Sequence, residues 1–289
     1  MGKYEAACRE IVETLLRLNN PTPEDLNKIK MQVLKKFHLD KIPSNSELLR
    51  YLRSKEEKRK LRFLLMKKRV RSISGVVTTT VMVKPFKCPK PVPCIYCPGG
   101  PALGTPQSYT RLEPACRRAL RNAFDPYDQV IDRIRQLKTI GHTVDKVELI
   151  ILGGTFTALP TKYQYWFVKR CLDALNGIEA RNFNEAKRIA SSPYARIRNS
   201  GITIETRPDC AKEKEADILL DLGVTRVEIG VQSLYDDVYK IIKRGHTVDD
   251  VIESFRILKD SGFKIVAHLM LNLPAVSYTH LTLPTTERV

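Results

Sequence analysis

Hydrophobic residues recur with two different periods along this chain, and the change of period divides it near residue 71. Before that point apolar side chains return every three or four positions, as in Cys8, Ile11, Val12 and Leu15, which is typical of amphipathic helices. The pattern predicts three helices. One ends before Asn20-Pro-Thr-Pro23, one runs from Thr22 to about Ile42, and one runs from about Ser46 through Val70.

From Gly75 onward, short apolar runs alternate with amphipathic stretches. Strands followed by helices predict parallel pairing through right-handed crossovers, hence an α/β sheet or barrel, and the near-continuous apolar runs indicate burial on both faces. The segment Asn182–Asn199 is the least regular part. The predicted strands are Val76–Val83, Val147–Leu152, Ile202–Glu205, Arg226–Val231 and Lys264–Leu269, and the predicted helices are Glu113–Gly141, Tyr163–Leu175, Lys212–Leu222, Leu234–Lys243 and Val248–Ser261.

The composition changes sharply after Pro274, where no charged residue occurs until Glu287. The chain as a whole is 28% charged. We therefore predict that residues 275–289 are a non-native tail, read from foreign sequence, and are not part of the fold.

Charge is also distributed unevenly. The chain carries 49 Lys and Arg against 32 Asp and Glu, a net charge of +17. Residues 1–71 hold 19 of the basic and 9 of the acidic residues, and Lys55–Arg71 is the densest part. A solvated charged face is the ordinary explanation of a basic helix, but this concentration favours contact with nucleic acid.

The N-terminus, the hydropathy and the cysteine count indicate the cellular compartment of the protein. The first ten residues are too charged for a secretory signal, and no apolar run approaches the length of a membrane span. Seven cysteines, an odd number, do not suggest a disulfide framework in a chain of 289 residues. These features predict a protein of a reduced, cytoplasmic compartment.

The strongest chemical signal is the stretch Cys88-Pro-Lys-Pro-Val-Pro-Cys94-Ile-Tyr-Cys97-Pro-Gly-Gly-Pro101, directly after the first predicted strand. A pair such as Cys94 and Cys97 serves zinc, redox and iron–sulfur chemistry alike. Three cysteines without a fourth leave one coordination position open, which suits a site that performs chemistry. Cys8, Cys116, Cys171 and Cys210 fall within or beside predicted helices and are expected to be small buried side chains.

Gly153-Gly154-Thr155 follows the second predicted strand. Glycine there allows a ligand close to the backbone, whose N–H groups can bind a carboxylate or phosphate. A Gly-Gly turn after a strand is equally compatible with an ordinary turn.

Together these motifs resemble the radical S-adenosylmethionine superfamily, and the chain more closely resembles the catalytic subunit of Elongator and its archaeal and bacterial relatives, with an N-terminus most similar to the archaeal members. The resemblance runs from about residue 1 to Pro274. It rests on Arg71–Val76, Cys94–Gly100, Gln107–Tyr109, Asp125–Tyr127, Gln136–Lys138, Gly141–Lys146, Gly153–Phe156, Ile202–Asp209, Glu228–Ser233, Arg244–Thr247 and Lys259–Lys264.

The resemblance implies modification of the wobble uridine (U34) of tRNA at carbon 5, with acetyl-CoA as the carbon source. It implies that Cys88, Cys94 and Cys97 ligate a [4Fe-4S] cluster whose free iron binds S-adenosylmethionine. It also implies an electron donor that reduces the cluster. Gly153, Gly154 and Thr155 would receive the amino-acid part of S-adenosylmethionine. The further implied cofactor contacts are Glu205, Arg207, Gln232 and His268, which would line the cavity, and Lys146, which is associated with acetyl-CoA.

The resemblance also implies the organisation of the chain. Residues 1–71 would form a basic helical tRNA-binding region and residues 72–274 a partial radical S-adenosylmethionine (β/α)6 barrel without its last β/α unit, leaving an exposed edge at the fifth strand. Leu271 stands where the family typically has proline. Because the family's acetyltransferase domain is absent after Pro274, we expect this chain not to complete the reaction.

Two other readings stay open at this stage. One is a different RNA-modifying radical enzyme, such as a methylthiotransferase, although those usually show tighter cysteine spacing. The other is a metal-stabilised RNA-binding module without catalysis, in which the three cysteines hold zinc or a structural cluster.

Overall fold

The computed structural model describes residues 2–275, which divide into two compact units. The helical unit comprises Met1–Val77 and Arg133–Asp145, and the sheet unit comprises Thr78–Asp132 and the residues from Lys146 onward. The first unit therefore extends slightly past residue 71, and it also takes up a distant segment, 133–145, that the sequence pattern did not assign to it.

Capping boxes start three of the helices of the helical unit. Thr22, Ser44 and Ser54 each accept a hydrogen bond from the backbone N–H three residues later, and the acidic side chain at that position bonds back. The elements are α1 Lys3–Arg17, α2 Pro23–Phe37, α3 Asn45–Leu49, α4 Lys55–Leu65 and the 3-10 turn η1 Arg69–Ser72.

The prediction of one helix from Ser46 through Val70 is therefore wrong. The chain leaves the helical conformation after α3, and α4 begins at Lys55, preceded by its N-cap Ser54, whose capping box with Glu57 starts a new helix. The apolar period continues across the break because both helices bury leucines, so the period alone did not reveal it.

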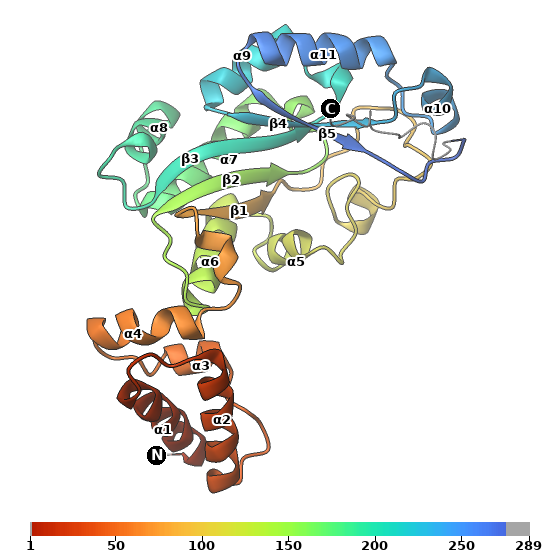
Figure 1. Ribbon diagram of the computed structural model, residues 1–289. Helices are drawn as coiled ribbons and strands as arrows, with labels where there is room; N and C mark the ends of the chain where they lie inside the picture. The colour runs from red at the N-terminus through yellow and green to blue at the C-terminus, as the bar shows by residue number, and fades with distance from the viewer. Residues whose placement is uncertain (1, 276–289) are drawn as a thin grey trace, which may run out of the picture. The chain divides into compact units, whose positions relative to one another are not determined.

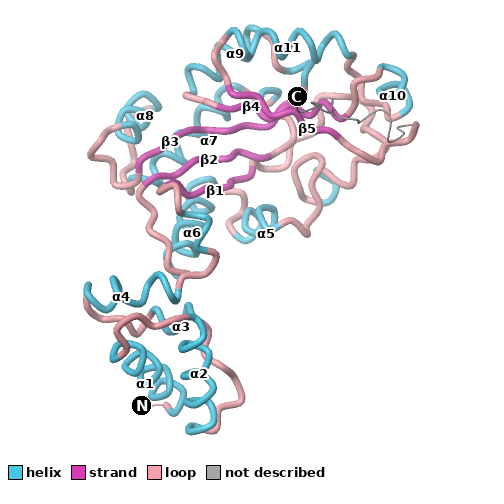
Figure 2. The backbone as a smooth tube through the Cα atoms, in the orientation of Figure 1, coloured by secondary structure: helices cyan, strands magenta, loops and turns pink. Residues whose placement is uncertain are grey.

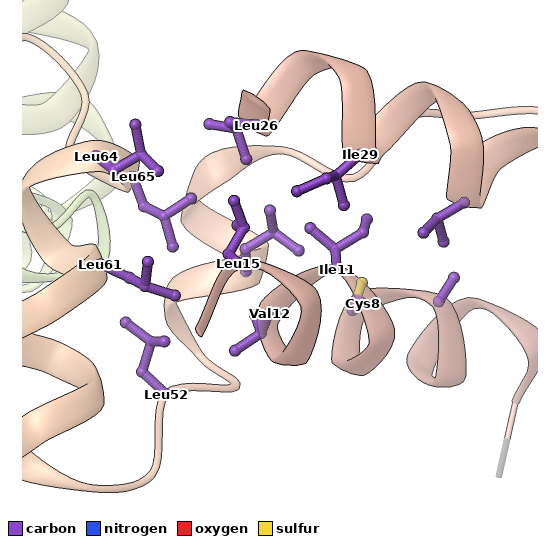
Figure 3. Close-up of a cluster of buried hydrophobic side chains, with 13 residues drawn as sticks. Cys8, Ile11, Val12, Leu15, Leu26, Ile29, Leu52, Leu61, Leu64 and Leu65 are labelled. Carbon is purple, nitrogen blue, oxygen red and sulfur yellow. The ribbon is translucent and has the colours of Figure 1, made fainter. Parts of the chain in front are cut away.

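The core of the helical unit lies where α1, α2 and α4 meet (Figure 3). Ile11 and Leu15 of α1 point towards Leu26 and Ile29 of α2 and towards the leucines of α4. Burial of such side chains contributes about 1.5–3 kcal/mol each. The segment 133–145 joins this unit through hydrogen bonds from Arg62 Nε to the Gly141 carbonyl (2.6 Å) and from the Lys67 N–H to the Ile140 carbonyl (3.1 Å).

The sheet unit contains a five-stranded sheet in the order β1-β2-β3-β4-β5, with parallel pairing from β2 to β5 (Figure 2). α7 lies alongside β3, α11 lies alongside β5, and α9 lies beside α11 (Figure 1). The strands are β1 Val76–Met82, β2 Lys146–Leu152, β3 Arg198–Thr206, β4 Arg226–Gln232 and β5 Lys264–Leu269. The helices after β1 are α5 Pro114–Arg121, α6 Pro126–Thr139, α7 Thr161–Asn176, α8 Phe183–Ser191, α9 Glu213–Leu222, α10 Asp236–Ile241 and α11 Val248–Asp260, with 3-10 turns η2 Pro101–Leu103, η3 Phe156–Ala158 and η4 Pro208–Cys210. All belong to the sheet unit except the part of α6 from Arg133 onward.

All five predicted strands are confirmed, as is the α/β class. The long helix predicted over Glu113–Gly141 is wrong, because Ala123 and Phe124 adopt positive φ and separate α5 from α6. The segment 182–199 is more regular than expected, since Asn182 caps α8.

The fifth strand ends the sheet order within residues 2–275. Its only sheet neighbour there is β4, and Val266 and Leu269 are exposed. This agrees with the expected exposed edge at the fifth strand. The prediction about residues 275–289 concerns a segment that, from 276 onward, lies outside the described residues.

Candidate active site

A cavity of about 400 Å³ lies on the face of the sheet unit formed by residues of β3, β4 and β5 and by the loop that carries the cysteines. Ligands of open parallel sheets bind near the carboxyl ends of the strands, where these side chains lie. The lining residues are Tyr96, Pro98, Ser108, Tyr109, Gly154, Glu205, Thr206, Glu228, Gly230, Gln232, Arg244, His268 and Met270.

The alternation of β4 explains how polar groups reach the cavity. Val227, Ile229 and Val231 are buried, whereas Glu228, Gly230 and Gln232 are partly exposed and line the cavity. Gln232 has φ of 73°, in the left-handed region that side chains other than glycine rarely adopt. Strained backbone of this kind tends to occur at functional sites.

Glu205, from the end of β3, is held by a cluster of donors. The Tyr109 hydroxyl donates to its carboxylate at 2.7 Å and 2.8 Å, and the N–H groups of Gly153 and Gly154 each donate to Oε2 at 3.1 Å. Burial, followed by the adjacent carboxylate, raises the pKa of Tyr109 well above its usual value. Tyr109 therefore stays protonated as a donor to Glu205.

The Gly153-Gly154 turn requires glycine for two reasons. A Cβ at Gly153 would overlap Cγ2 of Val83, and one at Gly154 would lie 3.0 Å from the Gln107 carbonyl oxygen. Gly154 also adopts φ of 78°. The turn therefore packs against the loop that continues the cysteine stretch, and its N–H groups are already used by Glu205.

A second carboxylate, Glu228, pairs with His268 of β5, with 3.0 Å between Oε2 and Nε2. The hydrogen bond to Glu228 raises the pKa of His268, against the opposing effect of burial. Arg244 adds a fixed positive charge to the same lining. The cavity thus offers carboxylates and a guanidinium, which complement the ammonium and carboxylate of an amino acid.

The cysteine loop borders this cavity through Tyr96 and Pro98. Cys94 Sγ lies 3.1 Å from Lys90 Nζ and 3.8 Å from Arg244 Nη1, and Cys97 Sγ accepts a hydrogen bond from Gln107 Nε2 at 2.8 Å. Burial raises the pKa of Cys94, but the hydrogen bonds from Lys90 and Arg244 outweigh it, so the net shift is downward. The loop therefore favours a thiolate at Cys94.

Within residues 2–275, no three His, Cys, Asp or Glu side chains lie close enough together to hold a metal ion. The structure therefore places Cys88, Cys94 and Cys97 on one loop, where all three are partly buried and none forms a disulfide, without bringing the three sulfurs together. As a donor set they still fit an iron–sulfur cluster, because thiolates are its usual ligands and Lys90 and Arg244 offset the negative charge.

Of the other predicted residues, Gly154, Glu205, Gln232 and His268 line the cavity. The remaining four, Gly153, Thr155, Arg207 and Lys146, do not.

Arg207 is 3% exposed and donates to Asp209 through Nε and Nη2 and to the Arg244 carbonyl through Nη1, so it fixes the neighbouring loop. Gly153 reaches the cavity only through its N–H bond to Glu205. Lys146 is exposed at the start of β2, about 20 Å along the strand from Gly153.

The sequence interpretation missed Tyr109, Glu228 and Arg244 as cavity residues. A usable signal existed for Glu228, because it shares strand parity with Gln232 on β4. Tyr109 and Arg244 lie on loops, and only the fold shows that they converge on Glu205 and Cys94.

Comparison with known proteins decides the family. The model of the radical SAM superfamily matches residues 85–281, which is more than half of the chain, and the ELP3 N-terminal domain matches residues 4–73. The chain belongs to the radical SAM superfamily, among the relatives of Elongator protein 3. This confirms the resemblance seen in the motifs.

Named relatives support the same placement. The tRNA uridine(34) acetyltransferase of Methanocaldococcus infernus is 51% identical over 81% of this chain and 44% of its own length. Elongator complex protein 3 of Schizosaccharomyces pombe is 42% identical over 93% of this chain and 51% of its own length. The chain thus spans about half the length of these curated relatives.

A solved relative shows the same fold in the region that it shares. The archaeal Methanocaldococcus infernus Elp3 with an N-terminal deletion matches with a TM-score of 0.58 and 41% identity, over 71% of this chain and 40% of that one. Separately, within residues 2–275 no helix has the length and apolarity that crossing a membrane requires.

Proposed function

We propose that this chain carries the radical-generating part of an enzyme that modifies the wobble uridine of tRNA. The observation that carries the proposal is the cavity itself, where the cysteine loop meets Glu205, Glu228 and Arg244. Relatives named for tRNA uridine(34) acetylation support tRNA as the substrate and U34 as the target. The complete carbon-5 reaction, its acetyl-CoA co-substrate and its electron donor are proposed for the whole protein.

In this proposal Cys88, Cys94 and Cys97 hold a [4Fe-4S] cluster. When bound, this cluster supplies the electron for reductive cleavage of S-adenosylmethionine, and hence radical chemistry at a carbon that proton transfer does not easily activate.

Residues of the chain would bind and orient S-adenosylmethionine. Glu205 and Glu228 would face its ammonium group and Arg244 its carboxylate, because protein partners already hold each of these charged side chains in place. Gln232 and Met270 complete the wall. Gly153 and Thr155 support the turn at the end of β2. The association of Lys146 with acetyl-CoA stays a prediction, at a position outside this cavity.

The helical unit supplies the surface for RNA. Its cations can release counterions from phosphate groups, and an unpaired anticodon base can be splayed out at modest cost.

Anaerobic reconstitution tests the proposal. The chain incubated with iron, sulfide and reductant should gain a cluster absorption band and convert S-adenosylmethionine to 5′-deoxyadenosine. Cys94→Ala should abolish both while RNA affinity stays within about twofold, because most of the net positive charge of the chain lies in the helical unit. Cys210→Ala, a partly exposed cysteine outside the loop, is the matched control and should behave as the wild type.

A colourless, zinc-bound chain whose RNA affinity ignores S-adenosylmethionine would instead favour a metal-stabilised RNA-binding module. Loss of RNA binding in folded Cys94→Ala would contradict the assignment of the two roles to separate residues.

A further inference from the structure

Helix α4 presents two contrasting faces. Leu61, Leu64 and Leu65 are buried in the core of the helical unit. Lys55, Arg59 and Phe63, spaced by four residues, lie on a different, exposed face. Phe63 is 64% exposed, and no aromatic or cation–π partner covers its ring among the described residues. We call these three residues the α4 ridge.

An isolated exposed apolar side chain is ordinary on a protein surface. The α4 ridge differs because a hollow lies on each side of it. Arg59 and Phe63 line both hollows, of about 560 Å³ and about 530 Å³. The first is completed by Lys55, Lys58, Arg62, Met66, Ser72 and Thr143, and the second by Asn19, Asn20, Pro21, Pro23, Glu56, Lys60, Leu64 and Arg69.

The charge around the ridge has one predominant sign. The side chains of Lys55, Lys58 and Arg59 make no hydrogen bond or ion pair within residues 2–275, and Glu56 is the only acid among the residues that line the two hollows. Unpaired cations at this density favour a polyanion that brings its own phosphate groups.

An exposed aromatic ring flanked by unpaired cations matches the chemistry of single-stranded nucleic acid. Each unpaired base stacks on an aromatic side chain while the neighbouring phosphates contact Lys and Arg. A continuous duplex keeps its bases stacked internally and offers only phosphates to such a surface. Phe63 lines both hollows and is 64% exposed, so its side chain is accessible to a nucleotide.

We propose that Phe63 is a stacking platform for an unpaired nucleotide of RNA, with Lys55, Lys58 and Arg59 contacting the phosphates beside it. The inference rests on the proposed function, in which RNA is the substrate, and adds a specific contact in the helical unit. It assigns to the α4 ridge a preference for unpaired over paired RNA.

The test compares two RNAs on the full chain by fluorescence anisotropy at fixed ionic strength. One is a stem–loop, and the other is the same stem extended through the loop as a continuous duplex. Phe63→Ala should weaken binding of the stem–loop about tenfold and leave the duplex within about twofold, since stacking contributes about 1–3 kcal/mol per base. Phe63→Trp should retain the stem–loop affinity, and Phe63→Leu should lose it, because leucine keeps apolar area but lacks a ring.

Two further variants serve as controls. Ile73→Ala removes another exposed apolar side chain (75% against 64% for Phe63), which lies outside both hollows, and it should change neither affinity. Arg59→Ala should weaken both RNAs and lower the slope of log affinity against log salt by about one.

Equal effects of Phe63→Ala on both RNAs, or no effect on either, would overturn the stacking assignment, as would wild-type chain that binds neither RNA. The reconstitution assay on the wild type is read independently. Its failure would refute the radical-enzyme proposal while leaving a positive stacking result intact.

Discussion

The two units of this chain treat charge in opposite ways. The helical unit has an apolar core of side chains such as Ile11, Leu15 and Leu61, and it leaves nearly all its cations in solvent. The sheet unit brings a few charges inside, such as Arg207 at 3% exposed, and gives them fixed partners. A surface of solvated cations suits a large polyanion, whereas fixed charges in a cavity suit one small ligand.

The largest expected difference lies within one helix of the helical unit. Leu61→Ala should lower the free energy of unfolding by about 3 kcal/mol, because it removes a fully buried side chain and leaves a cavity. Phe63→Ala, two residues further, should change it by less than about 0.5 kcal/mol. Urea unfolding of both variants measures this, and equal losses would mean that Phe63 is part of the core.

The next largest difference between the two units concerns the stability lost when an ion pair is broken. Lys169 pairs at 2.7 Å with Asp173, whose side chain is fully buried, so Lys169→Met should cost about 2 kcal/mol by leaving that carboxylate without its cation. In the helical unit, Lys36 pairs with Glu10 in solvent, and Lys36→Met should cost less than about 0.5 kcal/mol. Thermal unfolding of the two variants is the measurement. Similar costs would remove the contrast.

Acid should act on the buried histidine of the sheet unit. Burial, and then the nearby Arg244 and Arg207, lower the pKa of His246 to about 3, although Asp209 and Asp250 oppose the shift. Below pH 6.5 the unfolded chain therefore binds a proton that the folded chain excludes. The free energy of unfolding is therefore at its full value above pH 6.5, and it falls by about 1.4 kcal/mol per pH unit as the pH drops towards 3.

Denaturant unfolding at pH 6.5 and pH 5.5 tests this dependence. His246→Gln should reduce the loss of stability between the two values, and His38→Gln, at an exposed site, should leave it unchanged. The helical unit contributes in the same direction through buried His142, whose pKa burial also lowers. If stability depended on pH as steeply in His246→Gln as in the wild type, the pH dependence would not come from His246.

The smallest expected change concerns the cavity carboxylate. Glu205→Gln replaces one acceptor oxygen with a donor, so the turn at Gly153 and Gly154 or Tyr109 loses a hydrogen bond, at a cost of about 1 kcal/mol. Glu179→Gln, at an exposed carboxylate paired with Arg170, should stay within about 0.5 kcal/mol. Thermal unfolding compares them, and indistinguishable values would show that the Glu205 cluster contributes little to stability.

Much of the molecule follows from its sequence. β-branched runs such as Val76–Val83 specify strands, and their alternation with amphipathic stretches specifies a parallel sheet, because the period of burial is a local property. The three-cysteine stretch Cys88–Pro101, together with the other ordered motifs from Arg71–Val76 to Lys259–Lys264, likewise pointed to the family, since the spacing of ligands and glycine turns is a property of the local sequence. The boundaries of helices were harder to predict where two consecutive helices share one apolar period, as α3 and α4 do.

The tertiary structure alone decided which of the motif residues meet. Glu205 and the Gly153 turn lie 52 residues apart in sequence and share a hydrogen bond, Arg244 reaches Cys94 across 150 residues, and Arg207 turns to the loop instead of the cavity. Sequence determines which groups a chain possesses and on which elements they lie. Their convergence depends on strand order and on loop packing, which bring distant residues within hydrogen-bonding distance only in the folded chain.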